Sequence, residues 1–464
     1  MINEKLIEFN NYIRGKKVAV LGIGVSNIPL IDYLYKHNSK VTLFDKKEKD
    51  KIDKDIINKI NYYGMELSLG EGYLKNLNGF DIIFRSPSMR PDTPEIINEL
   101  ERGAILTSEI ELVVEMCPGT VIGVTGSDGK TTTTSLIYEI LKANGKKCYL
   151  GGNIGIPLFT KLEEMEKEDY VVLELSSFQL MTMKVSPKIS VITNITPNHL
   201  DIHKSYDEYI EAKANIFKYQ DETGILVTNY DNEITRKLAK NANGKVIYFS
   251  SREKLSTGII VDDGIIKKSE DGLRRHILNT KNMILRGTHN YENACAAIGA
   301  TGTIVEIENQ AKAIKEFRGV EHRLEFVRKI DGIKWYNDSI GSSPTRTIAG
   351  LNAFDEKIVL IAGGYDKHLE YDPIAKPIVD KVSSLILMGQ TADKIETAVK
   401  NELKSQQKDM KIYRVNTLEE AVTKAREVAK LGEIVLFSPA SASFDMFKNF
   451  MERGDKFKEI VQEM

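Results

Sequence analysis

The chain has 464 residues, a formal net charge of −2 and a charged fraction of 28 %. This length is too great for one hydrophobic core, so two to four domains are expected. The nearly balanced charge gives no sign of a nucleic-acid or membrane partner, and no apolar run is long enough to span a bilayer. Three scattered cysteines, Cys117, Cys148 and Cys295, form no metal-binding spacing and predict reduced thiols in a cytoplasmic protein.

The first unit opens with a predicted strand, Lys17 to Leu21, followed by the turn Gly22-Ile-Gly-Val-Ser-Asn27. An apolar-periodic helix and a second strand ending at Asp45 come next. This order resembles the opening of a Rossmann domain, with an acid at the end of the second strand. Asn27 stands where the third glycine of the fingerprint is expected, so a plain strand-to-helix turn is the alternative.

The stretch from Gly123 to Thr132 reads Gly-Val-Thr-Gly-Ser-Asp-Gly-Lys-Thr-Thr, between a predicted strand and a predicted helix. This is the layout of a phosphate-binding loop, in which backbone N–H groups and the helix dipole hold phosphate oxygens. Lys130 would reach the β- and γ-phosphates, and the Thr131 hydroxyl would ligate Mg²⁺. Val124 holds the usual leading glycine position, so a tight turn with a surface lysine is the alternative. Asp128 is expected to point away from the phosphates and cap a local N–H.

Two polar stretches follow predicted strands beyond this loop. The first is Glu174-Leu-Ser-Ser-Phe-Gln179, and the second is Asn194-Ile-Thr-Pro-Asn-His-Leu-Asp201. An acid at the carboxyl end of a strand beside a phosphate loop suits a Mg²⁺ ligand, although Ser176 or Ser177 could instead cap a helix. His199 alone is weak evidence. Lys213, flanked by alanines in the following helix, is interpreted from its spacing as a solvated surface residue.

Strands alternate with helices through the rest of the chain, which predicts α/β units with mostly parallel sheets. A small antiparallel excursion is expected in residues 251–285, and a third unit begins near Gly319. Polar groups follow the strands of this last unit. Its cations and hydroxyls would suit a carboxylate-bearing substrate, whereas ordinary turn chemistry is the alternative for each stretch alone. These stretches are His322-Arg323, Asn337-Asp338-Ser339, Gly363 to Lys367 and Ser438 to Asp445.

These motifs, in this order, resemble the Mur ligases of peptidoglycan synthesis. Gly151 to Gly155, Gly287 to Ala294 and Ser438 to Gly454 continue the resemblance, which covers nearly the whole chain. Ser438 to Gly454 and Glu174 to Leu180 are similar to the D-glutamate-adding branch, and the Asp-Asn-Pro-Arg motif of diaminopimelate-adding relatives is absent. The resemblance implies three α/β domains. They are an N-terminal Rossmann-like UDP-sugar-binding domain (1–108), a central P-loop ATPase-like domain with a small antiparallel sheet (109–319) and a C-terminal Rossmann-like amino-acid-binding domain (320–464).

The implied activity is an ATP-dependent amide ligase that adds D-glutamate to UDP-N-acetylmuramoyl-L-alanine through an acyl phosphate. The resemblance further implies ATP, two Mg²⁺ sites, a carbamylated Lys213 and a cytoplasmic monomer. Motif matching gives the catalytic set Lys130, Glu174, His199, Lys213 and Arg323, and the metal ligands Thr131, Glu174, His199 and Lys213. The ATP-binding set is Gly126, Ser127, Asp128, Gly129, Lys130, Thr131, Thr132, Asn290, Asn293, Arg323 and Asp338. The UDP-substrate set is Val25, Ser26, Asp45, Lys47, Asn153, Ser176 and Gln179. The D-glutamate set is Ser342, Lys367, Ser443, Phe444 and Phe450.

Three positions depart from the family pattern. Ile340 replaces a lysine near the amino-acid pocket, and Ser88 and Asn27 replace glycines in the UDP-sugar domain. Another Mur ligase or a folylpolyglutamate-synthase-like ligase remains an alternative, although the latter class lacks an N-terminal nucleotide-binding domain like Lys17 to Asp45. A non-catalytic nucleotide-binding protein would require degenerate metal positions, yet Lys130, Glu174, His199 and Lys213 are all present.

Overall fold

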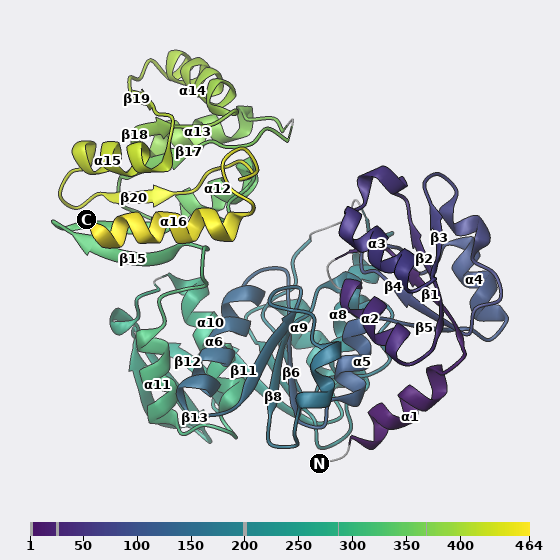
Figure 1. Cartoon of the computed structure of the whole chain (residues 1–464). Coiled ribbons are helices and arrows are strands. Elements are labelled where there is room, and N and C mark those ends of the chain that lie inside the picture. The colour runs from purple at the N-terminus through teal and green to yellow at the C-terminus, as the bar shows by residue number, and fades with distance from the viewer. Residues whose placement is uncertain (1–2, 25–26, 198–201, 286, 368) are drawn as a thin grey trace. The chain divides into compact units, whose positions relative to one another are not determined.

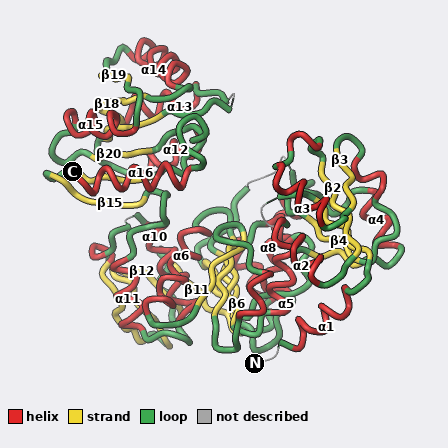
Figure 2. Tube along the Cα trace, viewed as in Figure 1, coloured by secondary structure: helices red, strands yellow, loops and turns green. Residues whose placement is uncertain are grey.

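The structure is a computed structural model that describes residues 3–24, 27–197, 202–285, 287–367 and 369–464 (Figure 1). The chain divides into two compact units, unit 1 (Met1–Lys315) and unit 2 (Glu316–Met464). Unit 1 contains two sheets and unit 2 contains one. Within each unit, helices pack around the strands, as Figure 2 shows.

The first sheet of unit 1 has five parallel strands in the order β3-β2-β1-β4-β5, which confirms the Rossmann-like prediction. Val18 and Val20 of β1 belong to one apolar cluster, whereas Ala19 and Leu21 belong to another, because successive side chains of a strand face opposite sides. The strands are β1 (Lys17–Leu21), β2 (Lys40–Asp45), β3 (Glu66–Leu69), β4 (Ile82–Arg85) and β5 (Ile105–Thr107). The helices are α1 (Glu4–Ile13), α2 (Ile28–Lys36), α3 (Lys54–Tyr62), α4 (Pro94–Glu101) and α5 (Glu109–Met116).

The second sheet of unit 1 has nine strands in the order β14-β13-β12-β11-β10-β9-β6-β8-β7. Strands β6 to β12 are parallel, and β12, β13 and β14 form the predicted antiparallel excursion. Strand β6 lies between β8 and β9, so the strand order changes direction here, and α/β sheets commonly bind ligands at the carboxyl ends of strands at such a point. The strands are β6 (Thr120–Thr125), β7 (Cys148–Gly152), β8 (Tyr170–Glu174), β9 (Ile189–Ile192), β10 (Ile225–Asn229), β11 (Lys245–Ser250), β12 (Gly258–Asp262), β13 (Ile265–Glu270) and β14 (Leu273–Asn279). The helices are α6 (Lys130–Ala143), α7 (Ser177–Leu180), α8 (Tyr206–Lys218), α9 (Glu233–Leu238), α10 (Thr288–Thr301) and α11 (Ile307–Glu316).

The sheet of unit 2 has the order β15-β16-β20-β17-β18-β19, parallel except for the β15–β16 pair. One cluster packs α12, α13 and α14 on one face, and another packs α15 and α16 on the other. Strand β15 was not predicted from the sequence, and its pairing with β16 shifts register between Phe326 and Arg328. The strands are β15 (Glu325–Ile330), β16 (Ile333–Asn337), β17 (Ile358–Ala362), β18 (Val382–Leu387), β19 (Lys411–Arg414) and β20 (Ile434–Phe437). The helices are α12 (Pro344–Asn352), α13 (Asp372–Lys381), α14 (Ala392–Gln406), α15 (Leu418–Val428) and α16 (Phe450–Glu463).

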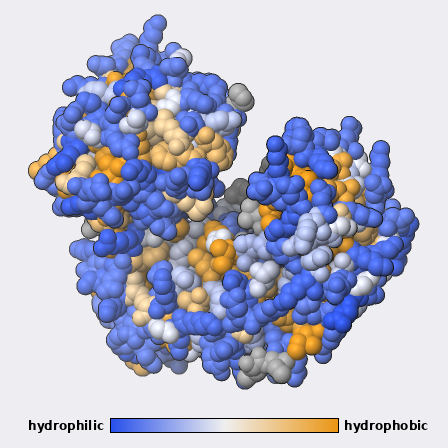
Figure 3. Space-filling model, viewed as in Figure 1, coloured by the Kyte–Doolittle hydropathy of each residue, from blue (hydrophilic) through white to orange (hydrophobic). Residues whose placement is uncertain are grey.

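The face of the molecule in Figure 3 is mainly hydrophilic. Among the residues that the structure describes, no helix combines the length and the apolar character needed to cross a bilayer.

Candidate active site

The loop between β6 and α6 has the conformation of a phosphate-binding turn. Gly126 and Gly129 have φ values of 153° and 79°, which residues other than glycine rarely adopt. The Lys130 ammonium folds back over the loop and donates to the carbonyls of Gly126 (2.8 Å) and Ser127 (2.9 Å). The Lys130 ammonium is therefore held against the backbone of the loop, where phosphate oxygens could replace these carbonyls as its hydrogen-bond acceptors.

The segment that follows β9, the strand next to β6, supports this loop with hydrogen bonds. Asn194 accepts a hydrogen bond from the Asp128 backbone N–H at 3.0 Å, and the Thr193 hydroxyl donates to the Asp128 carbonyl at 2.5 Å. The Asp128 side chain is exposed, and within the described part of the chain no local N–H is bonded to its carboxylate. The expected cap is thus wrong, and it is the Asp128 backbone that is anchored.

Glu174 ends β8 beside the loop and is 2 % exposed. One of its carboxylate oxygens accepts a hydrogen bond from the Asn153 amide at 2.8 Å. The other oxygen, Oε2, is buried without a hydrogen-bond partner among the described residues. A buried carboxylate oxygen that lacks a donor is costly unless a cation completes it, so the donor set fits Mg²⁺.

Lys213 is not a solvated surface residue, which corrects the interpretation from its spacing. It lies on α8 at 2 % exposure, donates to the Gly126 carbonyl at 2.8 Å and sits 4.7 Å from the centre of the Tyr209 ring. Burial, with the nearby Lys130 cation, holds the pKa of Lys213 well below its usual range. Both effects disfavour the charged form of Lys213, which lies directly beside the phosphate loop.

Helix α10 brings Asn290 and Asn293 to the same loop. The Asn293 side chain accepts from the Thr133 hydroxyl at 3.2 Å and donates to Asn290 at 3.4 Å. It also packs against Gly129 so closely that a Cβ at that glycine would collide with it. Both asparagines are thus placed beside the amino end of α6, together with Thr131 and Thr132.

In the first domain, Asp45 fixes the turn after β1. Its two carboxylate oxygens accept the backbone N–H groups of Ile23 (2.8 Å) and Lys47 (2.9 Å). Asn27 has a φ of −94°, which needs no glycine, and its amide donates to the carbonyls of Leu21 and Gly22. Asn27 therefore stands in place of the third glycine, and its side chain stabilises the turn through these two hydrogen bonds.

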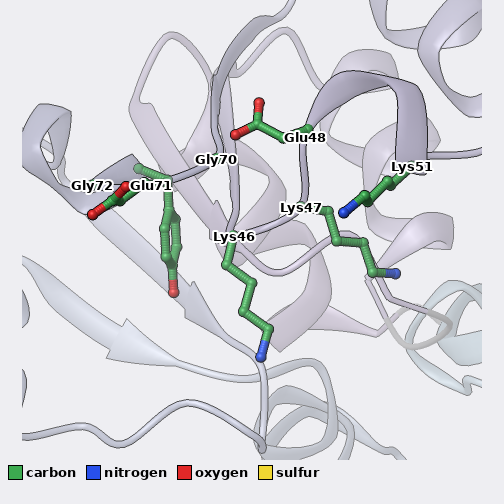
Figure 4. A pocket seen from close by; sticks show the side chains of 8 residues that line it. Lys46, Lys47, Glu48, Lys51, Gly70, Glu71 and Gly72 are labelled. Carbon is green, nitrogen blue, oxygen red and sulfur yellow. The ribbon is translucent and has the colours of Figure 1, made fainter.

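An open pocket of about 470 Å³ lies beside this turn, at the carboxyl ends of β2 and β3. Three lysine side chains project around it (Figure 4). The three lysines outnumber the two glutamates of the lining, and the net positive charge favours an anionic ligand such as a phosphate. The lining residues are Lys46, Lys47, Glu48, Lys51, Gly70, Glu71, Gly72 and Tyr73.

Ser176 and Gln179 form a capping box at the start of α7. The Ser176 hydroxyl accepts from the Gln179 N–H, and the Gln179 side chain accepts from the Ser176 N–H. The helix-capping alternative is therefore confirmed, and the substrate contacts of both residues stay predictions.

In unit 2, Asp338 holds the turn that presents Arg323. Its carboxylate accepts the Leu324 N–H at 3.2 Å and the Ser438 hydroxyl at 2.6 Å. Both neighbours of Arg323, His322 and Leu324, have positive φ values, of 62° and 45°, and Arg323 itself is exposed. Burial raises the pKa of Asp338 to about 7.

Four of the five predicted D-glutamate residues lie on loops that follow strands of unit 2, and the fifth, Phe450, is the first residue of α16. The Lys367 ammonium lies 5.4 Å from the centre of the exposed Phe444 ring. Ser443, the residue before Phe444, is buried. Phe450 begins α16, and the centre of its ring lies 6.0 Å from the centre of the His322 ring. Ser342 follows the Asp338 turn and is half-buried.

Val25, Ser26 and His199 lie outside the described residues. Sequence reasoning missed Thr193 and Asn194 as loop supports, and it missed Tyr209, whose hydroxyl is 2.9 Å from that of Ser127. The i, i+4 spacing of Tyr209 and Lys213 on one helix was the available signal.

Comparison with known families accounts for all three sheets. The MurD-like N-terminal domain model matches residues 16–108, the Mur ligase middle domain 124–301, and the Mur ligase glutamate ligase domain 322–441. The chain belongs to the Mur ligase family. Two relatives named UDP-N-acetylmuramoylalanine--D-glutamate ligase are similar to this Mur ligase along its length. The one from Acetivibrio thermocellus is 52 % identical over 462 residues, 99 % of each chain. The one from Clostridium novyi is 49 % identical over 458 residues, 98 % of this chain and 99 % of that protein.

A solved structure supports the fold of this Mur ligase. The UDP-N-acetylmuramate-alanine ligase of Thermotoga maritima matches with a TM-score of 0.54 at 21 % identity, covering 97 % of this chain and 99 % of that chain. As a Mur ligase, the chain is an ATP-dependent ligase. The phosphate loop fits ATP, and the incomplete coordination of Glu174 fits the Mg²⁺ that accompanies it.

Proposed function

We propose that this chain joins D-glutamate to UDP-N-acetylmuramoyl-L-alanine, with ATP converted to ADP and phosphate. Two relatives that match the chain over nearly its whole length, at 52 % and 49 % identity, are named for this reaction. The structural observation that carries the proposal is that the phosphate loop, a Glu174 carboxylate oxygen without a hydrogen-bond partner in the described structure and the buried Lys213 amine lie together at the carboxyl end of the central sheet. These are the groups that activation of a carboxylate by ATP needs.

The proposed reaction has two steps. The L-alanyl carboxylate attacks the γ-phosphorus of ATP and forms an acyl phosphate, with ADP as the leaving group. The amine of D-glutamate then attacks the acyl carbonyl, loses a proton, and displaces phosphate. The protein contributes positioning and charge stabilisation, and Lys130 would turn from the Gly126 and Ser127 carbonyls to the phosphates.

Thr131, Glu174, His199 and Lys213 are proposed to hold two Mg²⁺ ions, which would neutralise charge on the phosphates. Lys213 would serve as a carbamate. Its neutral amine nitrogen bonds to the carbon of CO₂ and loses one proton, which converts a buried amine into an anionic ligand. The support is that the Lys213 side chain is buried and that its Nζ lies beside the Gly126 carbonyl.

The two ends of the substrate are assigned to separate surfaces. The lysine-rich pocket beside Asp45 would take the UDP diphosphate, near Val25, Ser26 and Lys47. Asn153, Ser176 and Gln179 would face the muramoyl-alanine end. In unit 2, Lys367 would pair with a carboxylate of D-glutamate beside Ser342, Ser443, Phe444 and Phe450. Asn290 and Asn293 of unit 1, and Arg323 and Asp338 of unit 2, are proposed to contact ATP.

The three domains are proposed to be residues 1–108, 109–319 and 320–464, and the enzyme is proposed to act as a monomer. ATP and UDP-linked sugars are supplied in the cytoplasm, so the proposed reaction belongs there. The acyl phosphate has to be protected from water, and we propose that the C-terminal domain closes to do so.

The proposal is tested by ADP release from the full chain with UDP-N-acetylmuramoyl-L-alanine and a panel of D- and L-amino acids. D-glutamate alone should support turnover, and omission of the nucleotide substrate should abolish it. Turnover with L-lysine or diaminopimelate instead would place the chain elsewhere in the family. Activity on a folate with L-glutamate would favour the folylpolyglutamate-synthase-like alternative.

A further inference from the structure

Arg453 is a buried cation that the proposed reaction leaves unused. It lies on α16 at 1 % exposure, and its guanidinium reaches the loop after β16. Its Nε donates to the Ser339 hydroxyl at 3.0 Å, and its Nη2 donates to the Ser339 carbonyl at 2.8 Å. The Ser339 hydroxyl in turn donates to the Phe450 carbonyl at 2.8 Å. The loop that leads to Ser342 is therefore fixed to the start of α16.

The same guanidinium also holds the loop after β20. Nη1 donates to the Ala442 carbonyl at 2.8 Å, and Nη2 donates to the Ser441 carbonyl at 3.0 Å. The next residues along this loop are Ser443 and Phe444. One planar side chain thus bonds to both of the loops that carry the hydroxyls of the proposed D-glutamate pocket.

A third loop, the one that bears Lys367, joins the other two through a shared acceptor. The Ala442 carbonyl accepts the Tyr365 N–H at 2.9 Å in addition to Arg453. Gly364 permits this approach, because a Cβ there would collide with the Ala442 carbonyl oxygen and would lie 3.1 Å from Nη1 of Arg453. The segments that supply Ser342, Lys367 and Ser443 are consequently connected through a single buried group.

The hydrogen bonds of the Arg453 guanidinium go to oxygens of the loops rather than to an acid, although the Asp445 carboxylate lies near enough to favour its charge. Within the described residues, no ion pair joins its guanidinium to a carboxylate within 4 Å. Burial lowers the pKa of Arg453 to about 10, which leaves it charged at neutral pH. A buried cation that is bonded only to backbone carbonyls and a hydroxyl fixes its acceptors firmly, because losing any of them leaves part of a charge unsatisfied.

We infer that Arg453 is a positioning residue for D-glutamate, which holds the three substrate-facing loops of unit 2 in register. The inference rests on the proposed function for the identity of the amino acid. Lysine cannot replace the residue, because an ammonium is a point donor and lacks the planar fork that serves both loops at once.

The test measures KM for D-glutamate, ATP and UDP-N-acetylmuramoyl-L-alanine with full-length wild type, Arg453→Lys and Arg453→Met. Phe457→Leu is the matched control, since Phe457 is fully buried on the same helix and packs on Trp335 and Phe437 rather than on the loops. We expect Arg453→Lys to raise the KM for D-glutamate by about tenfold or more, with the other two KM values changed much less. Phe457→Leu should lower the unfolding temperature while leaving the KM for D-glutamate near that of wild type.

Two outcomes would overturn the inference. One is an unchanged KM for D-glutamate in Arg453→Lys, and the other is a parallel rise in all three KM values. Arg453→Lys keeps the charge, so it gives a result even if Arg453→Met does not fold. A wild-type enzyme that fails to use D-glutamate would instead refute the proposed substrate, and the inference with it.

Discussion

The amide of Asn153 donates to one oxygen of Glu174 at 2.8 Å, while the other oxygen of that carboxylate is buried without a partner in the described structure. Strand β7 places Asn153 beside β8, and the Asn153 backbone N–H also bonds to the Glu174 carbonyl. The carboxylate is therefore oriented before any cation arrives, with one oxygen held by the protein and the other left for a ligand.

Glu174→Gln should keep the fold and lose the metal-dependent step. The amide is similar in size and can still accept from Asn153, but it binds Mg²⁺ weakly, so kcat should fall by about 100-fold. Activity measured across a Mg²⁺ series should show a much higher half-saturating concentration. An unchanged Mg²⁺ dependence would remove Glu174 from the metal set, and an unchanged unfolding temperature serves as the fold control.

Lys213→Ala should abolish most turnover, because it removes the group proposed to become an anionic carbamate. Formate or acetate should restore part of the activity by supplying a carboxylate in the vacated space. The comparison is ADP release with sodium formate against the same concentration of sodium chloride. Full activity in the variant without any added carboxylate would contradict the carbamate role.

Asp128→Asn should strengthen ATP binding. The exposed carboxylate lies in the anion-binding turn, whereas the turn itself is held through the Asp128 backbone, which the substitution leaves intact. Removing one negative charge near the phosphates should lower the KM for ATP by roughly twofold to fivefold, with a larger effect at low salt. Steady-state kinetics at two ionic strengths checks this, and a higher KM would show that the carboxylate contributes to binding.

The stability of unit 2 should carry a pH signature from Asp338. Burial raises the pKa of Asp338 from 3.8 to about 7, so between these values the folded state holds a proton that the unfolded chain has released. The stabilisation is complete below the lower value and is lost as pH rises through about 7. Thermal unfolding of wild type and Asp338→Asn, compared from about pH 5 to about pH 8, should show wild type losing stability relative to the variant. A constant difference between the two proteins would place the pKa of Asp338 outside this window.

Asn27→Gly restores the usual third glycine of the fingerprint, yet it should weaken the protein. The substitution removes the hydrogen bonds to the Leu21 and Gly22 carbonyls and loosens a backbone that needs no positive φ. The free energy of unfolding should fall by about 2 kcal/mol, as measured by urea denaturation. Asn27→Asp, which lacks the amide donor, should behave similarly, and a more stable glycine variant would contradict this account.

The sequence alone predicted the strands that precede the chemistry and the residues that follow them. The strands that could be predicted are short apolar runs bounded by turns, so local composition and periodicity identify them. They include Lys17–Leu21, Thr120–Thr125 and Tyr170–Glu174. The phosphate loop was predictable because its glycines and Lys130 act within ten residues. Glu174 was predictable because the carboxyl ends of parallel strands meet at one edge.

Tertiary structure decided what periodicity could not. The spacing around Lys213 indicates a surface residue, but the β6 loop and Tyr209 bury it, and burial is what lowers its pKa. Asp338 is polar in sequence and titrates near neutral pH only because the fold encloses it. Arg453 lies 114 positions from Ser339, and no local pattern connects the two. Desolvation and long-range hydrogen bonds depend on which segments the fold brings together, so they appear only once the chain is packed.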